Sequence, residues 1–292
     1  MSRHATPLRY PGGKQKLSPF IREIIEANGL EGCDYSEPFA GGAGVAIELL
    51  LDGTASAIHL NDSCKRIYSI WWSILNETEE FCRRIRNASM TVDEWRRQKE
   101  IMRSSSRQKY IDLGFSAFFL NRVNRSGIFN GGVIGGLDQS GKWKMDARFP
   151  RNELIRRVEL IADRKSKIRI KNLDAEAFVA DYIPKMPLRS LVYFDPPYFR
   201  KADRLYLNHY APEDHKRLAS LIQKKVKRPW LVSYDNTPEI QKLYSERSSF
   251  CYFLQYNAAK YYEGSEFFAF SDKLDIPKSS SLHFINEAVS KR

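Results

Sequence analysis

The stretch Leu191-Val192-Tyr193-Phe194-Asp195-Pro196-Pro197-Tyr198-Phe199 decides the fold class of this 292-residue chain. Its first four residues are apolar and predict a buried strand, which must end at the prolines because proline has no N–H for a sheet ladder. Open α/β sheets bind ligands at such strand ends, and a carboxylate, a carbonyl and a ring held together suit a planar group that carries an amine. A plain proline turn after a core strand is the alternative at this point. The candidate catalytic residues are Asp195, Pro196, Pro197 and Tyr198.

The composition indicates a folded and basic protein. Hydrophobic residues make up 42% and aromatic residues 13% of the chain, which argues against general disorder. The length allows one large domain or two, with a substantial core. The net charge is +12, which favours a polyanionic partner over the alternative of a basic surface that is merely solvated.

The cysteines predict free thiols rather than a metal site. Cys33, Cys64, Cys82 and Cys251 are widely scattered, no pair has the spacing of metal ligands, and the histidines do not cluster with them. We therefore expect a reducing cytoplasm and no bound metal. The first residues contain no apolar signal-peptide core, and no segment approaches the length of a membrane span. A soluble cytoplasmic protein without a membrane partner is expected.

Residues 35–62 predict a strand, a glycine-rich turn, a helix and a second strand. Glycines at 41, 42 and 44 precede the helical segment 46–51, which is typical of the nucleotide site of a doubly wound sheet. The spacing does not match Gly-x-Gly-x-x-Gly, so a dinucleotide is not favoured. Asp62 ends the second strand and is well placed for ribose hydroxyls. Together, the turn and the acid favour a nucleoside-bearing cofactor over a purely structural turn.

From residue 63 to 153 the alternation of strand and helix stops, which predicts an insertion. Residues 83–109 carry nine Lys or Arg against three acids and form either a solvated face or the border of a polyanion site. The glycine-punctuated segment 121–148 predicts a loop or hairpin that supplies phosphate contacts, base-edge donors and stacking rings, with an ordinary mobile loop as the alternative. Its candidate DNA-binding residues are Asn121, Arg122, Asn124, Arg125, Ser126, Lys142 and Lys144.

The alternation resumes after residue 153 and completes a doubly wound α/β fold. Residues 168–170 and 230–234 predict strands, and 250–256 with 266–270 predict a closing antiparallel pair. Asp174 is a second acid at a strand end. It suits a hydrogen bond to the adenine of a cofactor, although a helix cap is equally consistent.

Together these pieces resemble the Dam-like (D12-class) DNA adenine-N6 methyltransferases. The resemblance covers most of the chain, from residue 9 to residue 270, and its Asp-Pro-Pro-Tyr motif is specific to amino-group methylation. The motifs, in order, are Arg9-Tyr10-Pro11-Gly12-Gly13-Lys14, Glu37-Pro38-Phe39-Ala40-Gly41, Asn61-Asp62, Phe119-Leu120-Asn121-Arg122 and Asp195-Pro196-Pro197-Tyr198. The resemblance implies a Rossmann-like methyltransferase sheet in a discontinuous catalytic domain (1–62 and 154–276), a mainly helical target-recognition insertion with a β-hairpin (63–153), and a flexible tail (277–292).

The resemblance also implies S-adenosylmethionine as the cofactor. The implied cofactor residues are Tyr10 and Lys14 at its border, Glu37, Pro38, Phe39 and Gly41 at its methionine end, Asp62 at the ribose, and Asp174 and Phe178 at the adenine. The glycine loop of the family is often Phe-x-Gly-x-Gly, whereas Ala43 replaces the second glycine here. Arg9 lies where the family often has a basic residue that reads the DNA, so we expect it to contact DNA.

The chemistry implied for this family fits the residues. The exocyclic amine of adenine is a poor nucleophile because its lone pair is delocalised into the ring. Asp195 and the Pro196 carbonyl would accept both amine protons and favour the geometry in which the lone pair is available, while the flipped base stacks on Tyr198. Positioning and electrostatics then carry the catalysis, and no covalent nucleophile is needed.

We therefore predict a monomeric DNA adenine-N6 methyltransferase that acts on double-stranded DNA in a bacterial, archaeal or phage-infected cell. A cytosine-N4 or RNA adenine methyltransferase is one alternative, and an inactive DNA-binding relative is another. Intact Asp195, Asp62 and Lys14 argue against the inactive relative. The residues leave open the recognition sequence and whether a cognate restriction or defence system is a partner.

Overall fold

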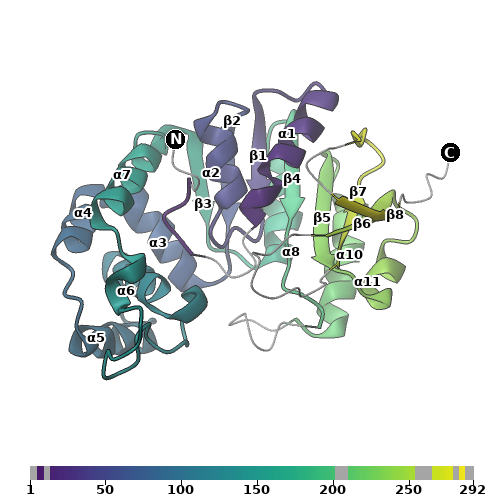
Figure 1. The fold of residues 1–292 in the computed structure, drawn as a ribbon. Helices are drawn as coiled ribbons and strands as arrows, with labels where there is room; N and C mark the ends of the chain where they lie inside the picture. The colour runs from purple at the N-terminus through teal and green to yellow at the C-terminus, as the bar shows by residue number, and fades with distance from the viewer. Residues whose placement is uncertain (1–4, 10–13, 201–209, 254–264, 279–282, 287–292) are drawn as a thin grey trace.

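The computed structural model describes residues 5–9, 14–200, 210–253, 265–278 and 283–286, and within these ranges eight strands form one sheet (Figure 1). Their order is β3-β2-β1-β4-β5-β7-β6-β8. Strands β1 to β5 pair in parallel, whereas β7 runs antiparallel to β5 and β6, and β8 runs antiparallel to β6. The bounds are β1 Cys33–Glu37, β2 Ala55–Asn61, β3 Ile168–Lys171, β4 Ser190–Phe194, β5 Trp230–Asp235, β6 Ser249–Phe253, β7 Ser265–Phe270 and β8 His283–Asn286.

Helices flank the sheet on both faces. Helices α1 and α2 share one hydrophobic cluster with the sheet, and α10 and α11 share a second one. No helix within the described ranges has the length and apolar character needed to cross a membrane. The α-helices are α1 Ser18–Ala27, α2 Gly44–Leu51, α3 Lys65–Asn76, α4 Thr78–Asn87, α5 Val92–Arg103, α6 Tyr110–Val123, α7 Arg151–Ala162, α8 Ala175–Ala177, α10 Pro212–Lys225 and α11 Pro238–Leu243. Shorter turns are the 3₁₀ segments Lys14–Leu17, Arg125–Gly127, Met145–Arg148, Lys165–Lys167 and Ile183–Lys185, and the π-helical turn Phe178–Tyr182.

Helix α1 forms where its local sequence predicts it. Pro19 lies in the first turn, where its missing N–H costs nothing. Phe20, Ile21 and Ile24 recur at helical spacing and are fully buried against the sheet. The helix ends before Gly29, whose φ of 60° is the left-handed conformation common after a helix.

The strand order reverses between β1 and β4. From β1 the chain builds outward through β2 and β3, and it then returns to β4, which pairs with the other side of β1 and leads to β5. Loops that leave the carboxyl ends of β1 and β4 in opposite directions create the crevice where doubly wound folds bind ligands. The predicted strand 191–194 lies beside this crevice, and the predicted fold class is confirmed.

Residues 63–153 are mainly helical and gather on the β3 side of the sheet (Figure 1). Their aromatic core joins three segments of the insertion: the ring of Phe118 lies 5.2 Å from Phe81 and 5.9 Å from Phe149, centroid to centroid. This core is continuous with the cluster beneath α1 and α2. The insertion is therefore packed onto the sheet rather than built around a core of its own.

The expected β-hairpin in the insertion does not form. Over residues 124–149 the only sheet pairing is one isolated antiparallel bridge between Asn124 and Val133. Gly135, Gly136 and Gln139 have φ values of 91°, 83° and 52°, which turn the backbone away from an extended path. The Gln139 amide donates to the carbonyls of Ile134 and Gly136 within this turn.

The expected boundary after residue 153 falls inside helix α7, which spans Arg151–Ala162. Helix α7 begins at Arg151, whose guanidinium donates to the carbonyls of Ile85, Arg86 and Ala88 at the end of α4. The start of α7 therefore belongs with the insertion. The tail is not wholly loose, since residues 283–286 form β8 at the edge of the sheet.

Candidate active site

The Asp195 carboxylate follows β4 directly and is held by other elements. The Ser233 hydroxyl on β5 donates to Asp195 Oδ1 at 2.9 Å, and the Lys14 ammonium lies 3.8 Å from the same oxygen. The hydroxyl oxygens of Tyr193 and Ser233 are 2.8 Å apart, which fixes Ser233 in turn. Among the described residues these contacts all fall on Oδ1, so Oδ2 is left for a ligand.

Burial raises the pKa of the Asp195 carboxyl to about 6. The Lys14 ammonium opposes this shift, the nearby carboxylate of Glu266 adds to it, and the Ser233 hydrogen bond lowers the pKa again. The Asp195 side chain keeps 25% of its surface exposed, so a ligand can reach it. Asp195 is therefore ionised at neutral pH and able to accept hydrogen bonds.

Glu266 on β7 joins the catalytic loop to the start of the chain. The Tyr198 hydroxyl donates to Glu266 Oε1 at 2.7 Å, and the Lys14 ammonium forms an ion pair with Glu266 Oε2. Lys14 also donates to the Tyr198 hydroxyl at 3.0 Å and lies 5.1 Å from the centroid of its ring. Glu266 is not among the predicted site residues, although an acid in an aromatic strand was a signal for it.

Asp235, at the end of β5, fixes the backbone after Tyr198. Its two carboxylate oxygens accept hydrogen bonds from the N–H groups of Phe199 at 2.7 Å and Arg200 at 2.9 Å. Asp235 lies directly opposite Glu266 in the β5–β7 pairing. Two neighbouring strands thus hold the loop, one through its backbone and the other through the Tyr198 hydroxyl.

The glycine turn after β1 is held by Asp62. Its two carboxylate oxygens accept hydrogen bonds from the N–H groups of Gly41 and Cys64, both at 2.9 Å, and the Trp71 indole donates to the Gly41 carbonyl at 3.0 Å. Gly41 has φ 46° and Ala43 has φ 45°. Ala43 therefore adopts a left-handed conformation that favours glycine.

Asn61, an unpredicted contributor, connects this turn to the end of β3. Its amide nitrogen donates to the carbonyls of Pro38 and Leu173, and its amide oxygen accepts from the Leu173 N–H at 3.0 Å. Asn61 was predicted only as part of a motif, without a role of its own. Its amide therefore links the residues that follow β1 to those that follow β3.

Two carboxyl groups beside the glycine turn have raised pKa values. Burial raises the pKa of Glu37 to about 8, against a lowering hydrogen bond from the Ala46 N–H, and burial raises the pKa of Asp62 to about 6. Neither has a cationic partner in the part of the chain that the structure describes. A positively charged ligand would favour both ionised forms. The described residues contain no group of His, Cys, Asp or Glu that could hold a metal ion.

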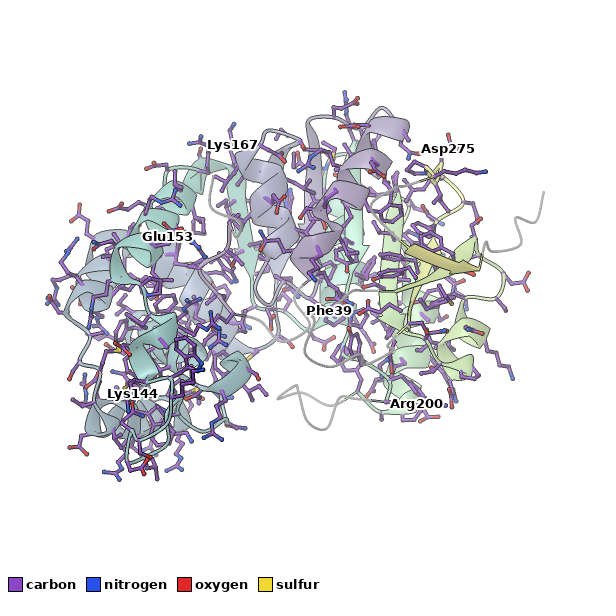
Figure 2. All side chains as sticks on the ribbon, viewed as in Figure 1. Phe39, Lys144, Glu153, Lys167, Arg200 and Asp275 are labelled. Atoms are coloured by element: carbon purple, nitrogen blue, oxygen red, sulfur yellow. The ribbon has the colours of Figure 1, made fainter. Side chains whose placement is uncertain are left out.

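Phe39 extends the site toward the opposite side of the crevice. It is half-buried, and its ring meets that of Tyr210 edge to face at 6.1 Å between centroids. In the view of Figure 2, Phe39 lies between Lys144 on the insertion and Arg200 after the catalytic loop. Pro38 is buried, and Tyr10 lies outside the described residues.

The two residues expected at an adenine ring have structural roles. The exposed Asp174 accepts a hydrogen bond from the Glu176 N–H at 2.8 Å as the N-cap of α8, which is the alternative that the sequence left open. Phe178 has no exposed surface and stacks on Tyr182 with centroids 4.7 Å apart. Phe178 therefore offers no surface to a ligand in this structure.

Three of the expected DNA-binding residues lie inside the insertion instead. Asn121, Arg122 and Asn124 are buried. The Asn124 amide donates to the carbonyls of Ile128 and Phe129, while its oxygen accepts from the Trp95 indole at 2.8 Å. Arg122 donates to the Arg148 carbonyl at 2.6 Å, and burial lowers its pKa to about 9, with a further contribution from Arg9. In this structure these three side chains satisfy internal hydrogen-bonding groups, and their contact with DNA stays a prediction.

Arg9 is held by residues of the insertion. Asn121 accepts from the Arg9 N–H at 2.8 Å and donates to the Arg9 carbonyl at 2.6 Å. The Arg9 guanidinium donates to the carbonyls of Arg122 and Asn124. A Cβ on Gly127 would lie 2.3 Å from the Arg9 carbonyl oxygen, so only glycine allows this approach. Contact between DNA and the rest of the half-buried guanidinium stays a prediction.

The other four candidates lie on the surface. Arg125, Ser126, Lys142 and Lys144 are all exposed, as contacts to DNA must be. Trp143 between the two lysines is 66% exposed, and the Lys142 ammonium lies 5.9 Å from its ring centroid. This group on the outside of the loop is the part of the motif that is free to meet a partner.

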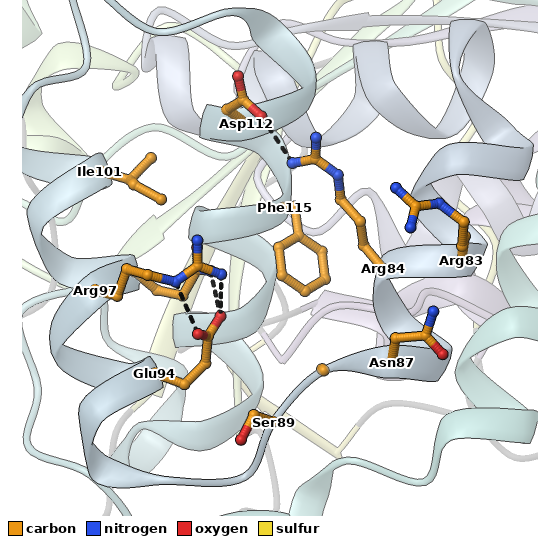
Figure 3. A pocket seen from close by; sticks show the side chains of 11 residues that line it. Arg83, Arg84, Asn87, Ser89, Glu94, Arg97, Ile101, Asp112 and Phe115 are labelled. Carbon is orange, nitrogen blue, oxygen red and sulfur yellow. Dashed lines mark hydrogen bonds and ion pairs between the residues drawn. The ribbon is translucent and has the colours of Figure 1, made fainter.

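The basic run 83–109 borders a pocket of about 320 Å³ between α4, α5 and α6 (Figure 3). Its arginines are paired there: Arg84 with Asp112 and Arg97 with Glu94, both at 2.8 Å. Because each of these cations faces a carboxylate, the pocket has little charge to attract a polyanion. The pairing favours the solvated-face interpretation of this run.

A family model described as D12 class N6 adenine-specific DNA methyltransferase matches residues 10–262. The chain belongs to this family. The match spans Lys14, the glycine turn, the insertion and the loop of Asp195, and it ends before Glu266. The resemblance inferred from the motifs is confirmed, and the chain is a methyltransferase with a Rossmann-like sheet.

A search among curated proteins finds no match. Among solved structures, the rRNA methyltransferase aviRa from Streptomyces viridochromogenes matches with a TM-score of 0.38 and 10% identity, over 90% of this chain and 87% of that chain. The yhhF protein from Escherichia coli matches with a TM-score of 0.35 and 9% identity, over 91% and 90%. Such identities are too low to transfer a substrate to this methyltransferase.

Proposed function

We propose that this methyltransferase moves a methyl group from S-adenosylmethionine to the N6 amine of an adenine flipped out of duplex DNA. The main support is the Asp195 carboxylate, whose Oδ1 is held by Ser233 and Lys14 while Oδ2 is open at the crevice. The family supports adenine in DNA as the substrate. The carboxyl groups around the glycine turn support the cofactor.

The residues beside the glycine turn fit a cationic cofactor. S-adenosylmethionine supplies an electrophilic methyl group on a positively charged sulfonium. Glu37 and Asp62 have pKa values raised by burial, so a nearby cation would favour their ionised forms and be held by them. Glu37 and Phe39 would flank the methionine end, Asp62 would accept from the ribose hydroxyls, and Lys14 would border the site.

Asp195 and Pro196 would prepare the amine for transfer. Asp195 Oδ2 and the Pro196 carbonyl would accept the two N6 protons, which favours the pyramidal nitrogen with an available lone pair. That lone pair forms the new bond to the methyl carbon as the carbon–sulfur bond breaks. The methylated nitrogen then loses a proton readily because it is positively charged, so Asp195 need not be a strong base. Catalysis rests on positioning and electrostatics.

The target base must leave the DNA stack to reach Asp195. Tyr198 would stack on the flipped base, and its hydroxyl is already fixed by Glu266. Unstacking costs on the order of a few kcal/mol, which phosphate contacts offset. Arg125, Lys142 and Lys144 are the exposed cations that would make these contacts.

One labelling experiment tests the proposed function. The protein is incubated with methyl-labelled S-adenosylmethionine and duplex DNA of mixed sequence, and the DNA is digested to nucleosides and separated. We expect the label in N6-methyladenine. Label in N4-methylcytosine, or in RNA but not in DNA in a parallel reaction, would replace the proposed substrate, and no label in any nucleic acid would contradict the activity.

A further inference from the structure

A carboxylate lies on a face of β7 that is otherwise aromatic. Glu266 is 4% exposed, and the strand continues as Phe267-Phe268-Ala269-Phe270. A buried carboxylate is costly unless it is paired and hydrogen-bonded. Glu266 accepts hydrogen bonds from the hydroxyls of Tyr198 and Tyr252, each at 2.7 Å. It also forms the ion pair with Lys14, so its charge is engaged by partners from the catalytic loop, from β6 and from the start of the chain.

The Lys14 ammonium lies between two carboxylates and is closer to Glu266 than to Asp195. It pairs directly with Glu266, whereas Asp195 Oδ1 is 3.8 Å away. Without the charge of Glu266, Lys14 would move toward Asp195 and form a full ion pair. That pair would draw the negative charge of Asp195 toward Lys14 and away from the open oxygen.

We propose that Glu266 is a positioning residue for the methyl transfer: it holds Tyr198 and Lys14 in place so that Asp195 keeps one oxygen for the substrate amine. The inference rests on the proposed function and adds to it a residue that lies outside the family match. Glu266 touches neither the amine nor the methyl group in this scheme. It acts through Lys14 and Tyr198.

The charges around Asp195 make this role measurable. Lys14 lowers the pKa of Asp195, Glu266 raises it, and Asp195 also faces Glu37 from β1 and the Tyr193 hydroxyl from its own strand. Without the negative charge of Glu266, the lowering effect of Lys14 on the pKa of Asp195 is no longer counteracted. The pKa of Asp195 should then fall, and the acid limb of the kcat profile should move to lower pH.

Steady-state kinetics on DNA compares Glu266→Gln with Glu213→Gln, an exposed carboxylate on α10 that pairs with Lys216. Glutamine keeps one oxygen that can accept from a tyrosine hydroxyl, but it has no charge with which to pair the Lys14 ammonium. For Glu266→Gln we expect kcat to fall about 100-fold, both KM values to change less than about threefold, and the acid limb to shift downward. Glu213→Gln should match the wild type. An unchanged kcat, or a lower kcat with an unmoved acid limb, would overturn the proposal.

The proposal can still be tested if Glu266→Gln does not fold or does not turn over. A second variant serves the first case, and a measurement without turnover serves the second. Glu266→Asp keeps the charge on a shorter side chain, so kcat should fall while the acid limb stays at its wild-type pH; a limb that moves would count against the proposal. Carbon-13 NMR of labelled aspartates, with Asp195→Asn for assignment, reads the Asp195 titration without turnover. A midpoint shared by wild type and Glu266→Gln would overturn the proposal, whereas a wild type that transfers no methyl group contradicts only the proposed function.

Discussion

The loop after β4 and the loop between α6 and α7 both carry dense polar motifs, but they use their polar side chains in opposite ways. In the first loop, Asp235 on a neighbouring strand fixes the backbone, so Asp195 is left with an open oxygen. In the second, Asn121 in the last turn of α6 and Asn124 directly after it donate to the backbone carbonyls of the loop, and both are buried. A loop held from outside can present its side chains to a ligand, whereas an irregular loop uses them to satisfy its own N–H and C=O groups.

The largest effect is expected at the loop held from outside. Asp195→Ala removes the acceptor of the amine proton, so methyl transfer should fall about 1,000-fold or more. Binding of S-adenosylmethionine, measured by calorimetry, should stay near the wild-type value. Asp163→Ala on the surface is the matched control. Near-normal turnover of Asp195→Ala would remove Asp195 from the site.

The acidic limb of the wild-type enzyme follows from the same residue. The pKa of Asp195 is raised to about 6, and a protonated carboxyl no longer accepts both hydrogen bonds as the carboxylate does. We expect kcat to be level above this pH and to fall about tenfold for each pH unit below it. A kcat that is flat from pH 7 to pH 5 would show that the charge of Asp195 is not needed.

In the loop between α6 and α7, removing an internal hydrogen-bonding side chain should lower the free energy of unfolding. Asn124 is fully buried and its amide group makes three hydrogen bonds, so Asn124→Ala should cost about 3 kcal/mol of unfolding free energy. Urea unfolding followed by circular dichroism measures this cost. Arg125→Ala, one residue further and exposed, should leave stability unchanged. Equal stabilities of the two variants would contradict the internal role of Asn124.

Removing an exposed cation from the same loop should weaken DNA binding. Arg125→Ala should weaken binding to duplexes of any sequence and reduce the salt slope by about 1, because one phosphate contact is lost. Lys167→Ala is the control, since Figure 2 shows Lys167 far from Phe39, in the turn that precedes β3. Fluorescence anisotropy over a series of salt concentrations gives both values. Identical slopes for the two variants would move the DNA contact to another surface.

The smallest effect is expected at the glycine turn. Glu37 there satisfies a backbone group, the Ala46 N–H, as the internal residues of the insertion loop do, and it also faces the proposed cofactor. Its folded pKa is raised from 4.5 to about 8, so the wild type loses stability as pH rises through that window. Glu37→Gln removes this loss: its melting temperature should exceed the wild type at pH 8 and match it at pH 4, while cofactor binding weakens. A difference in melting temperature that does not depend on pH would show that Glu37 is not buried as a neutral group.

Much of the fold and half of the site could be predicted because they depend on neighbours in the chain. Apolar runs and prolines are local, and they predicted β4 and the closing pair β6–β7 correctly. Asp62 follows the strand that carries it, so its place beside the glycine turn was also predictable. The hairpin was not, since glycines that permit a turn do not reveal whether strands pair on either side of it.

The sequence alone determined the family, the doubly wound sheet and the carboxylate at its switch point, since each rests on motifs of a few consecutive residues. Only the tertiary structure decided which polar residues face a ligand. Asn121 and Arg125 are four residues apart and equally polar, yet one is buried and the other exposed. Glu266 meets Lys14 across 252 positions of sequence, because β7 inserts between β5 and β6. Contacts of that range depend on strand pairing, which no local pattern specifies.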